Sequence, residues 1–594
     1  MRILTTVLLL AAALVGVFFL LPTPGSEGSG ETAAEPARPD RIIAIRDVRL
    51  FDGESVIDSA TLVLADGRVE SAGVGVEIPD GAEIVDGAGR TVLPGLVDAH
   101  VHAFGRARRD AVRFGVTTML DMFRPPDDLA TIRAERDSTA TIDRADLYSA
   151  GFLATAEGGH GTQYGIEVPT ISTPAEADHW VAARVEEGSD WIKIVIENGE
   201  GWGGDLPSLD DATIRALVDA AHARNLLAVA HASTRAEALR AIAAGVDGLV
   251  HAFADAPADE AFLAAARDSG IFVVPTATVM AGAFGASGEG WLAGRERIAG
   301  RLSPEQRRSL AQAFPGAEGR TDRMPRLLDN IAAMHGAGVP LLAGSDAPNP
   351  GTAHGASLHH EMRLMADAGM APVEVLRAAT STPARIFALD GRGCLQPGCR
   401  ADVVLVDGNP LDDIAATADI VSVFRNGRRV ELDPDVETPA SGEVPAAPPR
   451  DLLAEADRWM AASDRYQGGR STAVLEVHDD AIAVSGSLAE GFAYPYGGGM
   501  WSPTGVPMVP ADLRGHDALV LRVTGSIDRV RLMLFSGEDA ASQPFWIDLE
   551  TGMQHRLEFA RLAGVEAARI GAVGVFASDA PGDYDFRIER MDLE

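Results

Sequence analysis

The 594-residue chain is poor in lysine, cysteine and positive charge. Lys193 is its only lysine, so 50 of the 51 basic residues are arginine. Acidic residues number 86, which gives a net charge of −35. So acidic a chain is a poor partner for phosphate backbones, and charge alone would not hold it on an anionic membrane. We therefore expect no nucleic-acid partner.

Two cysteines, Cys394 and Cys399, are too few for a zinc ribbon or a disulfide-rich scaffold. They flank a predicted turn at Pro397–Gly398, across which a short disulfide can form in an oxidising compartment. Two unpaired loop thiols are the alternative, and the sequence does not decide between them.

Long apolar runs are equally scarce. Residues 3–21 form one, about long enough to cross a bilayer as a helix, and a Pro/Gly/Ser/Glu/Ala linker follows at 22–40. We interpret residues 1–21 as a signal or membrane-anchor segment. This predicts an exported protein, periplasmic or extracellular, with a tether to the inner membrane through residues 3–21 as one outcome.

The middle of the chain predicts an α/β fold. Residues 93–392 alternate apolar strand-like runs with Ala-rich helical runs, and we count eight candidate strands: Leu96–Val101, Thr117–Met122, Ala145–Phe152, Trp191–Ile196, Leu226–Ala230, Val246–Val250, Ile271–Pro275 and Pro340–Gly344. Eight such units predict a (β/α)8 TIM-like barrel. The long stretch Met280–Gly338 before the last strand is expected to be helical and to shape the mouth of the barrel.

Regions rich in β-strand patterns surround this barrel in the sequence. Residues 41–92 and 393–432 contain short apolar runs joined by Asp-Gly and Asn-Gly turns, and we expect them to pair into one small β-sandwich. A second linker is expected at 433–450. Residues 451–594 alternate with period two and predict an all-β sandwich.

Metal-type ligands recur where the predicted barrel strands end. In His100-Val-His102 both imidazoles point to the same side of the first strand, because side chains alternate along a strand. His231, His251 and Asp346 end the fifth, sixth and eighth strands. The carboxyl ends of barrel strands hold the active site in this architecture, so this set predicts a metal centre rather than core packing.

Lys193 lies on the fourth predicted strand, beside these ligands. Arginine replaces lysine well on a surface but cannot lose its proton in a protein. A chain that retains one lysine, and retains it there, is predicted to use it for chemistry that arginine cannot perform.

The motifs resemble a known superfamily. Val92-Leu-Pro-Gly-Leu-Val-Asp-Ala-His-Val-His102 resembles the opening strand of the metal-dependent amidohydrolases, and the order His-x-His, Lys, His, His, Asp is similar to their two-metal members. The runs Gly158-Gly-His160-Gly and Ser189-Asp-Trp-Ile-Lys-Ile look most like the imidazolonepropionase-like and prolidase-like branch.

This resemblance implies two divalent metal ions, with zinc as the expected metal, and a hydroxide bridging them as nucleophile. It implies the following ligands: His100 and His102 for the first ion, His231 and His251 for the second, carboxylated Lys193 as the bridge, and Asp346 as ligand and proton acceptor. From their loops we add His160 as a catalytic hydrogen-bond donor to the oxyanion, and Tyr164 and His354 as substrate-binding residues. Ordinary loop histidines are the alternative for His160 and His354.

In the C-terminal region, Ser463–Ala473 and Val573–Phe576 look like the complex I intermediate-associated protein family. That resemblance implies a jelly roll similar to galactose-binding domains. It makes residues 451–594 a candidate for contact with a glycan or a protein.

We therefore predict a metal-dependent amidohydrolase that cleaves a C–N bond in a small molecule: an amide, a dipeptide or an N-acyl amino acid. A lactone or ester hydrolase on the same site is one alternative. A one-metal deaminase, which would not need Lys193, is another, and a non-catalytic binding protein is a third. The sequence leaves the oligomeric state open.

Overall fold

The computed structural model describes residues 42–162, 168–202, 205–314, 317–433, 447–464, 470–478, 481–489, 495–504, 511–536, 545–562, 565, 567–578 and 581–594. The apolar run 3–21 and Tyr164 lie outside these residues. Within them, no helix has the length and apolar character needed to cross a membrane.

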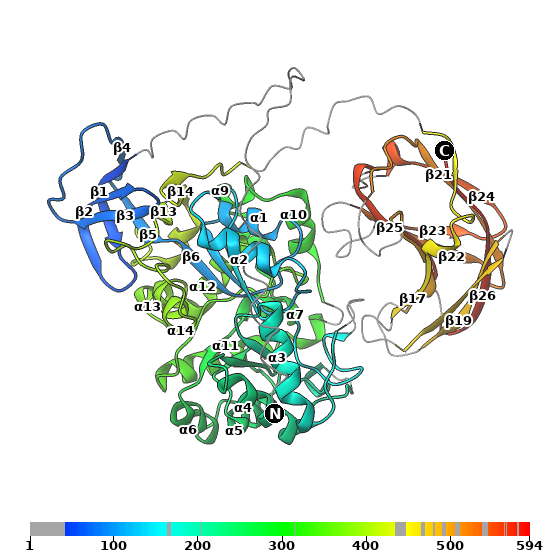
Figure 1. The fold of residues 1–594 in the computed structure, drawn as a ribbon, viewed down its shortest axis with the longest axis horizontal. Helices are drawn as coiled ribbons and strands as arrows, with labels where there is room; N and C mark the ends of the chain where they lie inside the picture. Colours follow the sequence, from blue (N-terminus) through cyan, green and yellow to red (C-terminus); the bar gives the residue numbers. More distant parts are fainter. Residues whose placement is uncertain are drawn as a thin grey trace, which may run out of the picture. The chain divides into compact units, whose positions relative to one another are not determined.

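The first β-rich unit combines both ends of the barrel sequence, as predicted. Its strands are β1 (Ile43–Phe51), β2 (Val56–Ala65), β3 (Arg68–Gly73), β4 (Glu83–Asp86), β5 (Arg90–Pro94), β13 (Val403–Asp407), β14 (Ile420–Arg425) and β15 (Arg428–Arg429). They pair in the order β15-β14-β13-β5-β1-β2-β3, with β4 beside β1 (Figure 1). The β2–β3 turn at Asp66–Gly67 has φ of 50° and 74°, as a two-residue type I′ hairpin requires.

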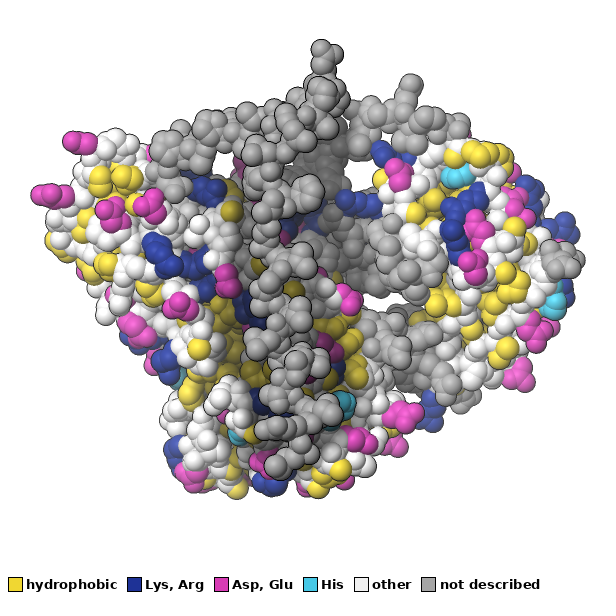
Figure 2. Space-filling view, viewed as in Figure 1, with side chains coloured by type: hydrophobic (Ala, Val, Ile, Leu, Met, Phe, Trp, Pro, Cys, Tyr) yellow, Lys and Arg dark blue, Asp and Glu magenta, His cyan; other side chains and the backbone are white. Residues whose placement is uncertain are grey.

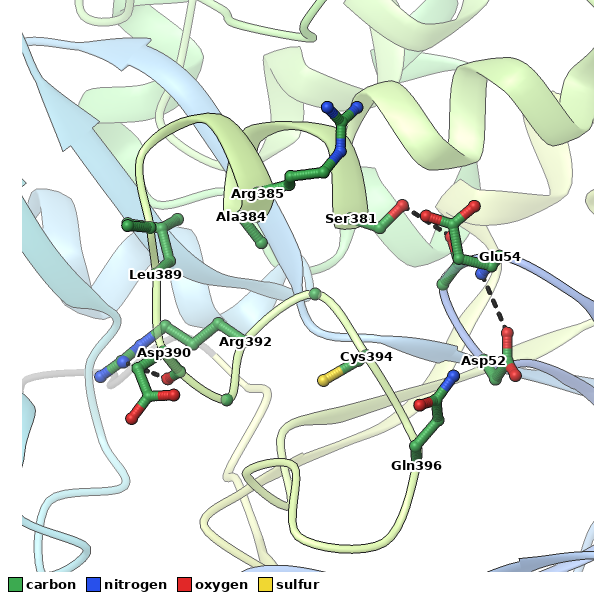
Figure 3. Close-up of a pocket in the computed structure, with 14 residues that line it drawn as sticks. Asp52, Glu54, Ser381, Ala384, Arg385, Leu389, Asp390, Arg392, Cys394 and Gln396 are labelled. Carbon is green, nitrogen blue, oxygen red and sulfur yellow. Dashed lines mark hydrogen bonds between the residues drawn. The ribbon is translucent and has the colours of Figure 1, made fainter. Parts of the chain in front are cut away.

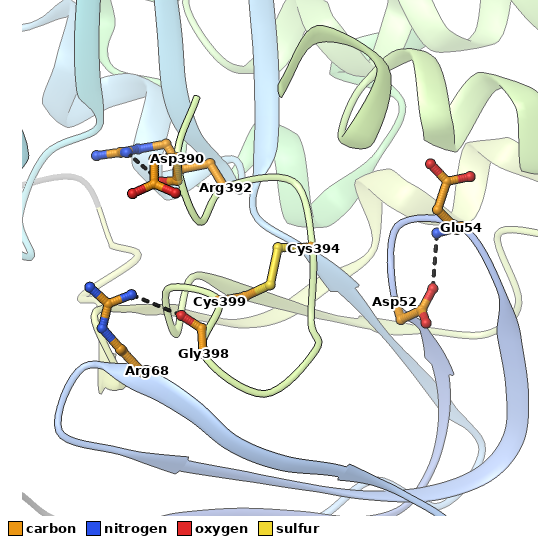
Figure 4. Close-up of a disulfide and its surroundings, with 8 residues drawn as sticks. All are labelled: Asp52, Glu54, Arg68, Asp390, Arg392, Cys394, Gly398 and Cys399. Atoms are coloured by element: carbon orange, nitrogen blue, oxygen red, sulfur yellow. Dashed lines mark hydrogen bonds between the residues drawn. A yellow bond between two sulfur atoms is a disulfide. The ribbon is translucent and has the colours of Figure 1, made fainter. Parts of the chain in front are cut away.

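A disulfide joins Cys394 and Cys399, so of the two sequence alternatives the bonded one is present (Figure 4). Their sulfurs are 2.03 Å apart and their Cα atoms 6.0 Å. The bridged loop pairs with β3, because Gly398 N donates to Val69 O and Val69 N donates to Cys399 O, each at 2.9 Å. The disulfide therefore closes the loop, and these hydrogen bonds attach the loop to the β-rich unit.

Seven parallel strands form most of the barrel wall: β6 (Leu96–Val101), β7 (Val116–Asp121), β8 (Asp146–Ser149), β9 (Ile192–Val195), β10 (Ala228–His231), β11 (Gly248–Val250) and β12 (Phe272–Val274). They hydrogen-bond in the runs β6-β7-β8 and β9-β10-β11-β12. A parallel bridge between Ala154 and Ile194 joins the two runs. These strands match seven of the eight expected ones to within a few residues.

The eighth expected strand, Pro340–Gly344, is not a regular strand. It still closes the barrel, because Leu341 bridges to β12 at Val273 and Ala343 O accepts from Ala99 N on β6. The ladder is interrupted at Ser345, whose main-chain N–H donates to the buried carboxylate of Asp98 at 2.9 Å, and pairing with β6 resumes at the parallel bridge between Val101 and Ala347. A side chain thus replaces a ladder partner next to the site.

Helices cover the barrel strands. They are α1 (Ala107–Arg113), α2 (Leu129–Asp137), α3 (Ala177–Glu187), α4 (Asp211–His222), α5 (Arg235–Ala244), α6 (Glu260–Ser269), α12 (Ala356–Asp367), α13 (Pro372–Ala378) and α14 (Ser381–Ile386). Side chains of Asp210, Thr234 and Asp259 cap α4, α5 and α6 by accepting from a main-chain N–H three residues on. The insertion is helical as predicted, with α7 (Ala277–Ala283), α8 (Glu289–Ala293), α9 (Glu296–Ala299), α10 (Pro304–Ala311) and α11 (Arg323–Gly336).

The C-terminal region is all-β and consists of two antiparallel sheets. One sheet has the order β18-β19-β26-β21-β24 with β16 beside β26, and the other has the order β17-β20-β25-β22-β23. Their bounds are β16 (Arg450–Asp451), β17 (Trp459–Ser463), β18 (Thr472–His478), β19 (Ala481–Leu488), β20 (Gly497–Trp501), β21 (Ala518–Gly525), β22 (Arg529–Ser536), β23 (Phe545–Glu550), β24 (Gln554–Glu558), β25 (Ile570–Ala577) and β26 (Gly582–Leu593). Side chains from both sheets, among them Trp501, Leu521 and Phe586, share one core.

Candidate metal centre

Asp346 meets the first two predicted histidines. His100 lies on β6, His102 follows that strand, and Asp346 follows the closing segment. Asp346 Oδ1 lies 3.3 Å from His100 Nε2 and 3.2 Å from His102 Nε2. The register of β6 against the closing segment produces this contact, because Asp346 N donates to His100 O at 2.7 Å.

The other two predicted histidines continue the cluster. His251 follows β11, and its Nδ1 lies 3.9 Å from Asp346 Oδ2. Its Nε2 lies 3.0 Å from Nδ1 of His231, the last residue of β10. His100, His251 and Asp346 each offer one ligand atom within 4.8 Å of the others. The five residues predicted from strand ends are therefore brought together.

Three non-glycine residues at this edge have left-handed backbone angles. They are His251 (φ 87°), Thr276 (φ 49°) and Asp346 (φ 53°). Such conformations cost roughly 1–3 kcal/mol each and persist where the surroundings enforce them. Here the Thr276 hydroxyl lies 2.8 Å from His251 Nδ1, so Thr276 orients the His251 ring.

Burial keeps the inner imidazoles uncharged. It lowers the pKa of His100 well below the usual value, and the positive charge of Lys193 lowers it further. Burial also lowers the pKa of His251, with help from His231 and Lys193. A neutral imidazole is the form that binds metals, so the site is prepared for a cation.

Several buried polar atoms of the cluster have no hydrogen-bond partner among the described residues. They are Nδ1 of His100, Nδ1 of His102 and Oδ1 of Asp346. Native proteins seldom leave such atoms unpaired without a functional reason. The open Asp346 Oδ1 faces Nε2 of both histidines, and imidazole nitrogen with carboxylate oxygen is a donor set that a divalent cation accepts, so these residues fit a metal.

Lys193 lies on β9, paired in register with Val229 of β10. Its side chain is only 2% exposed, and burial lowers its pKa to about 7 against the attraction of Asp346 and Asp121. Within the described part of the chain, no carboxylate lies within 4.0 Å of its amine. The only lysine is thus a buried amine without an ion-pair partner among the described residues. It is close enough to the cluster for the negative charge of Asp346 to influence its pKa.

The remaining predicted residues differ in placement. The His160 ring lies 4.7 Å from the His231 ring, between centroids, and burial lowers its pKa to about 3. His354 is buried, and its Nε2 lies 3.1 Å from the main-chain oxygen of His102. His160 therefore joins the cluster, whereas His354 contacts the loop that carries a ligand. Tyr164 is outside the described residues.

Sequence reasoning missed two buried carboxylates. Asp98 accepts from Ser345 N at 2.9 Å and from Ser345 Oγ at 2.6 Å, and burial raises its pKa to about 7. Glu197 lies 3.5 Å from His231 Nε2. Burial alone would raise the pKa of Glu197, but its hydrogen bonds outweigh burial and hold that pKa low. For Asp98 the signal was parity, because it lies two residues before His100 on β6 and so on the same side of the strand. Glu197 lies beyond the end of β9, where strand alternation gives no such signal.

A cavity of about 470 Å³ lies elsewhere, between α14, the Asp52–Glu54 turn and the loop to Cys394 (Figure 3). Ser381, Arg385 and Arg392 line it, and none of the cluster residues does. We assign it no part in the chemistry.

Comparisons with known proteins agree with the geometry. The profile of the Amidohydrolase family matches residues 91–430. The chain is 24% identical to an ochratoxinase of Aspergillus niger over 438 residues, which cover 64% of this chain and 84% of that protein. It is 27% identical to an imidazolonepropionase of Rhizorhabdus wittichii over 399 residues, covering 61% and 92%.

A solved structure shows the same fold. A Xaa-Pro dipeptidase with bound methionine superposes with a TM-score of 0.53 at 22% identity, over 66% of this chain and all of that one. The profile match spans more than half of the chain and includes every residue of the cluster. The chain therefore belongs to the amidohydrolase family and is a metal-dependent hydrolase.

Proposed function

We propose that this protein hydrolyses a C–N bond in a small molecule with the help of two divalent metal ions, and that both are zinc. The observation that carries the proposal is the convergence of four histidines, Asp346 and the only lysine at one edge of the barrel. His100 and His102 would hold one ion with Asp346, and His231 and His251 the other. When bound, such ions supply Lewis acidity and lower the pKa of water.

Lys193 would bridge the two ions as a carbamate. Its neutral amine adds to CO2, which forms an N–C bond, releases one proton and creates two ligand oxygens. Only a neutral amine reacts, and the lowered pKa of about 7 makes that form abundant at neutral pH. The absence of an ion-pair partner within the described residues leaves the amine available.

Asp346 would take a proton from the attacking water and deliver it to the leaving nitrogen. Its Oδ1 has no hydrogen-bond donor among the described residues and lies at the centre of the cluster. General acid–base transfer of this kind contributes roughly 10²–10⁴-fold to rate. His160, uncharged at neutral pH, would donate an N–H to the oxyanion from beside His231.

An amide or dipeptide is favoured over a lactone or ester by the named relatives. The Xaa-Pro dipeptidase, by its name, acts on dipeptides, and the imidazolonepropionase is a second relative. The test is zinc analysis of the purified protein, followed by a panel of dipeptides, N-acyl amino acids, lactones and esters. Two ions per chain with turnover of amides is the expected result. Turnover of lactones or esters alone would move the assignment to them.

A one-metal deaminase is the second candidate, and one observation favours it. His100, His251 and Asp346 alone form a compact three-ligand group within 4.8 Å. One ion per chain, release of ammonia and indifference to loss of Lys193 would establish it. A protein without metal or turnover would instead be a binding protein.

We further propose export to the periplasm or cell exterior, with residues 3–21 as leader or inner-membrane tether. The disulfide supports this, because such bonds persist in oxidising compartments.

For residues 451–594 we propose a glycan or protein contact. Trp546 on β23 is 56% exposed, with the Arg531 guanidinium 4.3 Å from its ring centre. Exposed aromatic rings of this kind are common at binding surfaces.

A further inference from the structure

Two buried glutamates lie behind His231, and only one touches it. Glu197 follows β9, and Glu237 lies in the first turn of α5; each is 1% exposed. Glu237 accepts the main-chain N–H groups of Ser233, Thr234 and Asn198 at 2.8–3.0 Å. It therefore organises the loop after β10 without contacting a ring.

Glu197 faces the outer nitrogen of His231. Its Oε2 lies 3.5 Å from His231 Nε2, and its Oε1 accepts from Gly199 N at 2.6 Å. The Ser233 hydroxyl donates to Oε2 and lies 3.5 Å from the same His231 nitrogen. His231 Nε2 thus has two oxygen neighbours, one carboxylate and one hydroxyl.

The donor and acceptor capacities of Glu197, Ser233 and His231 determine where their hydrogens lie. A carboxylate can only accept, and a hydroxyl has one proton, which Ser233 gives to Glu197. Toward His231 Nε2 both oxygens are therefore acceptors. The ring nitrogen between them has to carry a hydrogen, so the lone pair of a neutral His231 is on Nδ1.

That second nitrogen is the one turned toward the cluster, 3.0 Å from His251 Nε2. We propose that Glu197, supported by Ser233, is a positioning residue that holds His231 in the Nε2–H tautomer and so makes Nδ1 a metal ligand. Ligating histidines are commonly oriented by a carboxylate on the other nitrogen. The inference rests on the proposed function only in taking His231 as a ligand.

The other three histidines lack this arrangement. His251 has Thr276 on its outer nitrogen, and a hydroxyl can donate or accept, so it selects no tautomer. Nδ1 of His100 and of His102 have no partner among the described residues. Loss of Glu197 should therefore weaken the His231–His251 position and spare the His100–His102 position.

The experiment compares Glu197→Gln with a matched control, Glu237→Gln, in the full-length protein. Each replaces one buried carboxylate behind His231 with a neutral amide of the same shape. The first readout is the ¹⁵N spectrum of histidine-labelled, metal-free protein, with the His231 signal assigned by its loss in His231→Ala. The second is Zn²⁺ affinity by chelator competition.

We expect His231 to be Nε2–H in the wild type and in Glu237→Gln, and a tautomer mixture in Glu197→Gln. Zn²⁺ at the weaker of two sites should bind about 10–100-fold less tightly in Glu197→Gln. An unchanged tautomer and affinity, or an equal change in Glu237→Gln, would overturn the inference. If Glu197→Gln does not fold, Ser233→Ala decides: Glu197 then remains as the carboxylate acceptor at His231 Nε2, so His231 should stay Nε2–H. A tautomer mixture in Ser233→Ala would assign the selection to Ser233 and overturn the role of Glu197.

Failure of the proposed function would look different. If His231→Ala binds Zn²⁺ with wild-type stoichiometry and affinity, His231 is not a ligand. The spectrum of the metal-free protein still shows whether Glu197 sets the tautomer.

Discussion

A buried carboxylate of the C-terminal β-region and two buried carboxylates of the barrel differ in how completely they are hydrogen-bonded. In the C-terminal region, buried Asp464 accepts the N–H and hydroxyl of Ser471 and the N–H of Tyr496. In the barrel, Oδ1 of Asp346 and Oε1 of Glu361 have no donor among the described residues, and burial raises the pKa of Glu361 to about 8. Asp464 is therefore satisfied, whereas Asp346 and Glu361 each keep one oxygen open.

Surface charges in the C-terminal region are also paired. Arg531 with Asp548 and Arg514 with Asp512 form short ion pairs, and Figure 2 shows acidic and basic side chains intermixed over that region. Exposed pairs of this kind contribute little to stability but keep a surface soluble. The difference teaches that buried carboxylate oxygens without a donor, rather than charge itself, point to the reactive part of this molecule.

The largest effect is expected from Lys193→Arg. Arginine keeps the charge but cannot form a carbamate, and it places a permanent cation beside the ligands. We expect loss of at least one metal ion and a fall in turnover of several orders of magnitude, measured by metal analysis and steady-state kinetics. Lys193→Ala leaves a space instead, so formate or acetate should restore part of the activity. Two metal ions and normal turnover in Lys193→Arg would refute the bridging role.

A matched pair of substitutions tests the comparison directly. Asp346→Asn should lower kcat by roughly 10²–10⁴-fold, because the amide cannot accept the proton. Asp464→Asn should leave kcat unchanged and lower only the stability of the C-terminal region, by about 1–3 kcal/mol for a disrupted buried hydrogen bond. Kinetics and thermal unfolding measure both. A catalytic defect in Asp464→Asn would mean that the C-terminal region takes part in the reaction.

A smaller effect, on stability alone, is expected from the double variant Cys394→Ser and Cys399→Ser. Closing so short a loop is worth about 2 kcal/mol in the chain-entropy account. Denaturant unfolding of the oxidised wild type and the variant measures the difference. Metal content should not change, since the bridge lies on the β-rich unit; metal loss would show that this unit supports the centre.

The smallest effect on turnover is expected from a variant that ends at Asp433. All cluster residues and the family match lie before this point. The truncated protein should retain metal content and kcat/KM, with circular dichroism as the control for folding. A folded but inactive truncation would show that residues 451–594 complete the site.

Much of the site could be predicted because barrel geometry converts sequence position into spatial position. His102, His231, His251 and Asp346 lie just at or beyond the ends of strand segments, and parallel strands bring those ends to one edge. The helical insertion and the turn at Asp66–Gly67 were readable from local preferences. The closing segment was mispredicted as a regular strand, because the Asp98–Ser345 hydrogen bond that interrupts its ladder joins residues 247 positions apart.

By itself, the sequence determined the strand and helix pattern, the types of ligand residue and the fact that Lys193 is the only lysine. These depend on local periodicity and residue chemistry. Only the tertiary structure decided which atoms of those ligands meet, that Cys394 and Cys399 are bonded, and that Glu197 rather than Glu237 touches His231. Those outcomes depend on strand register and side-chain direction across distant segments. Both are set by packing in the folded chain, where a shift of one residue would turn every side chain to the other face.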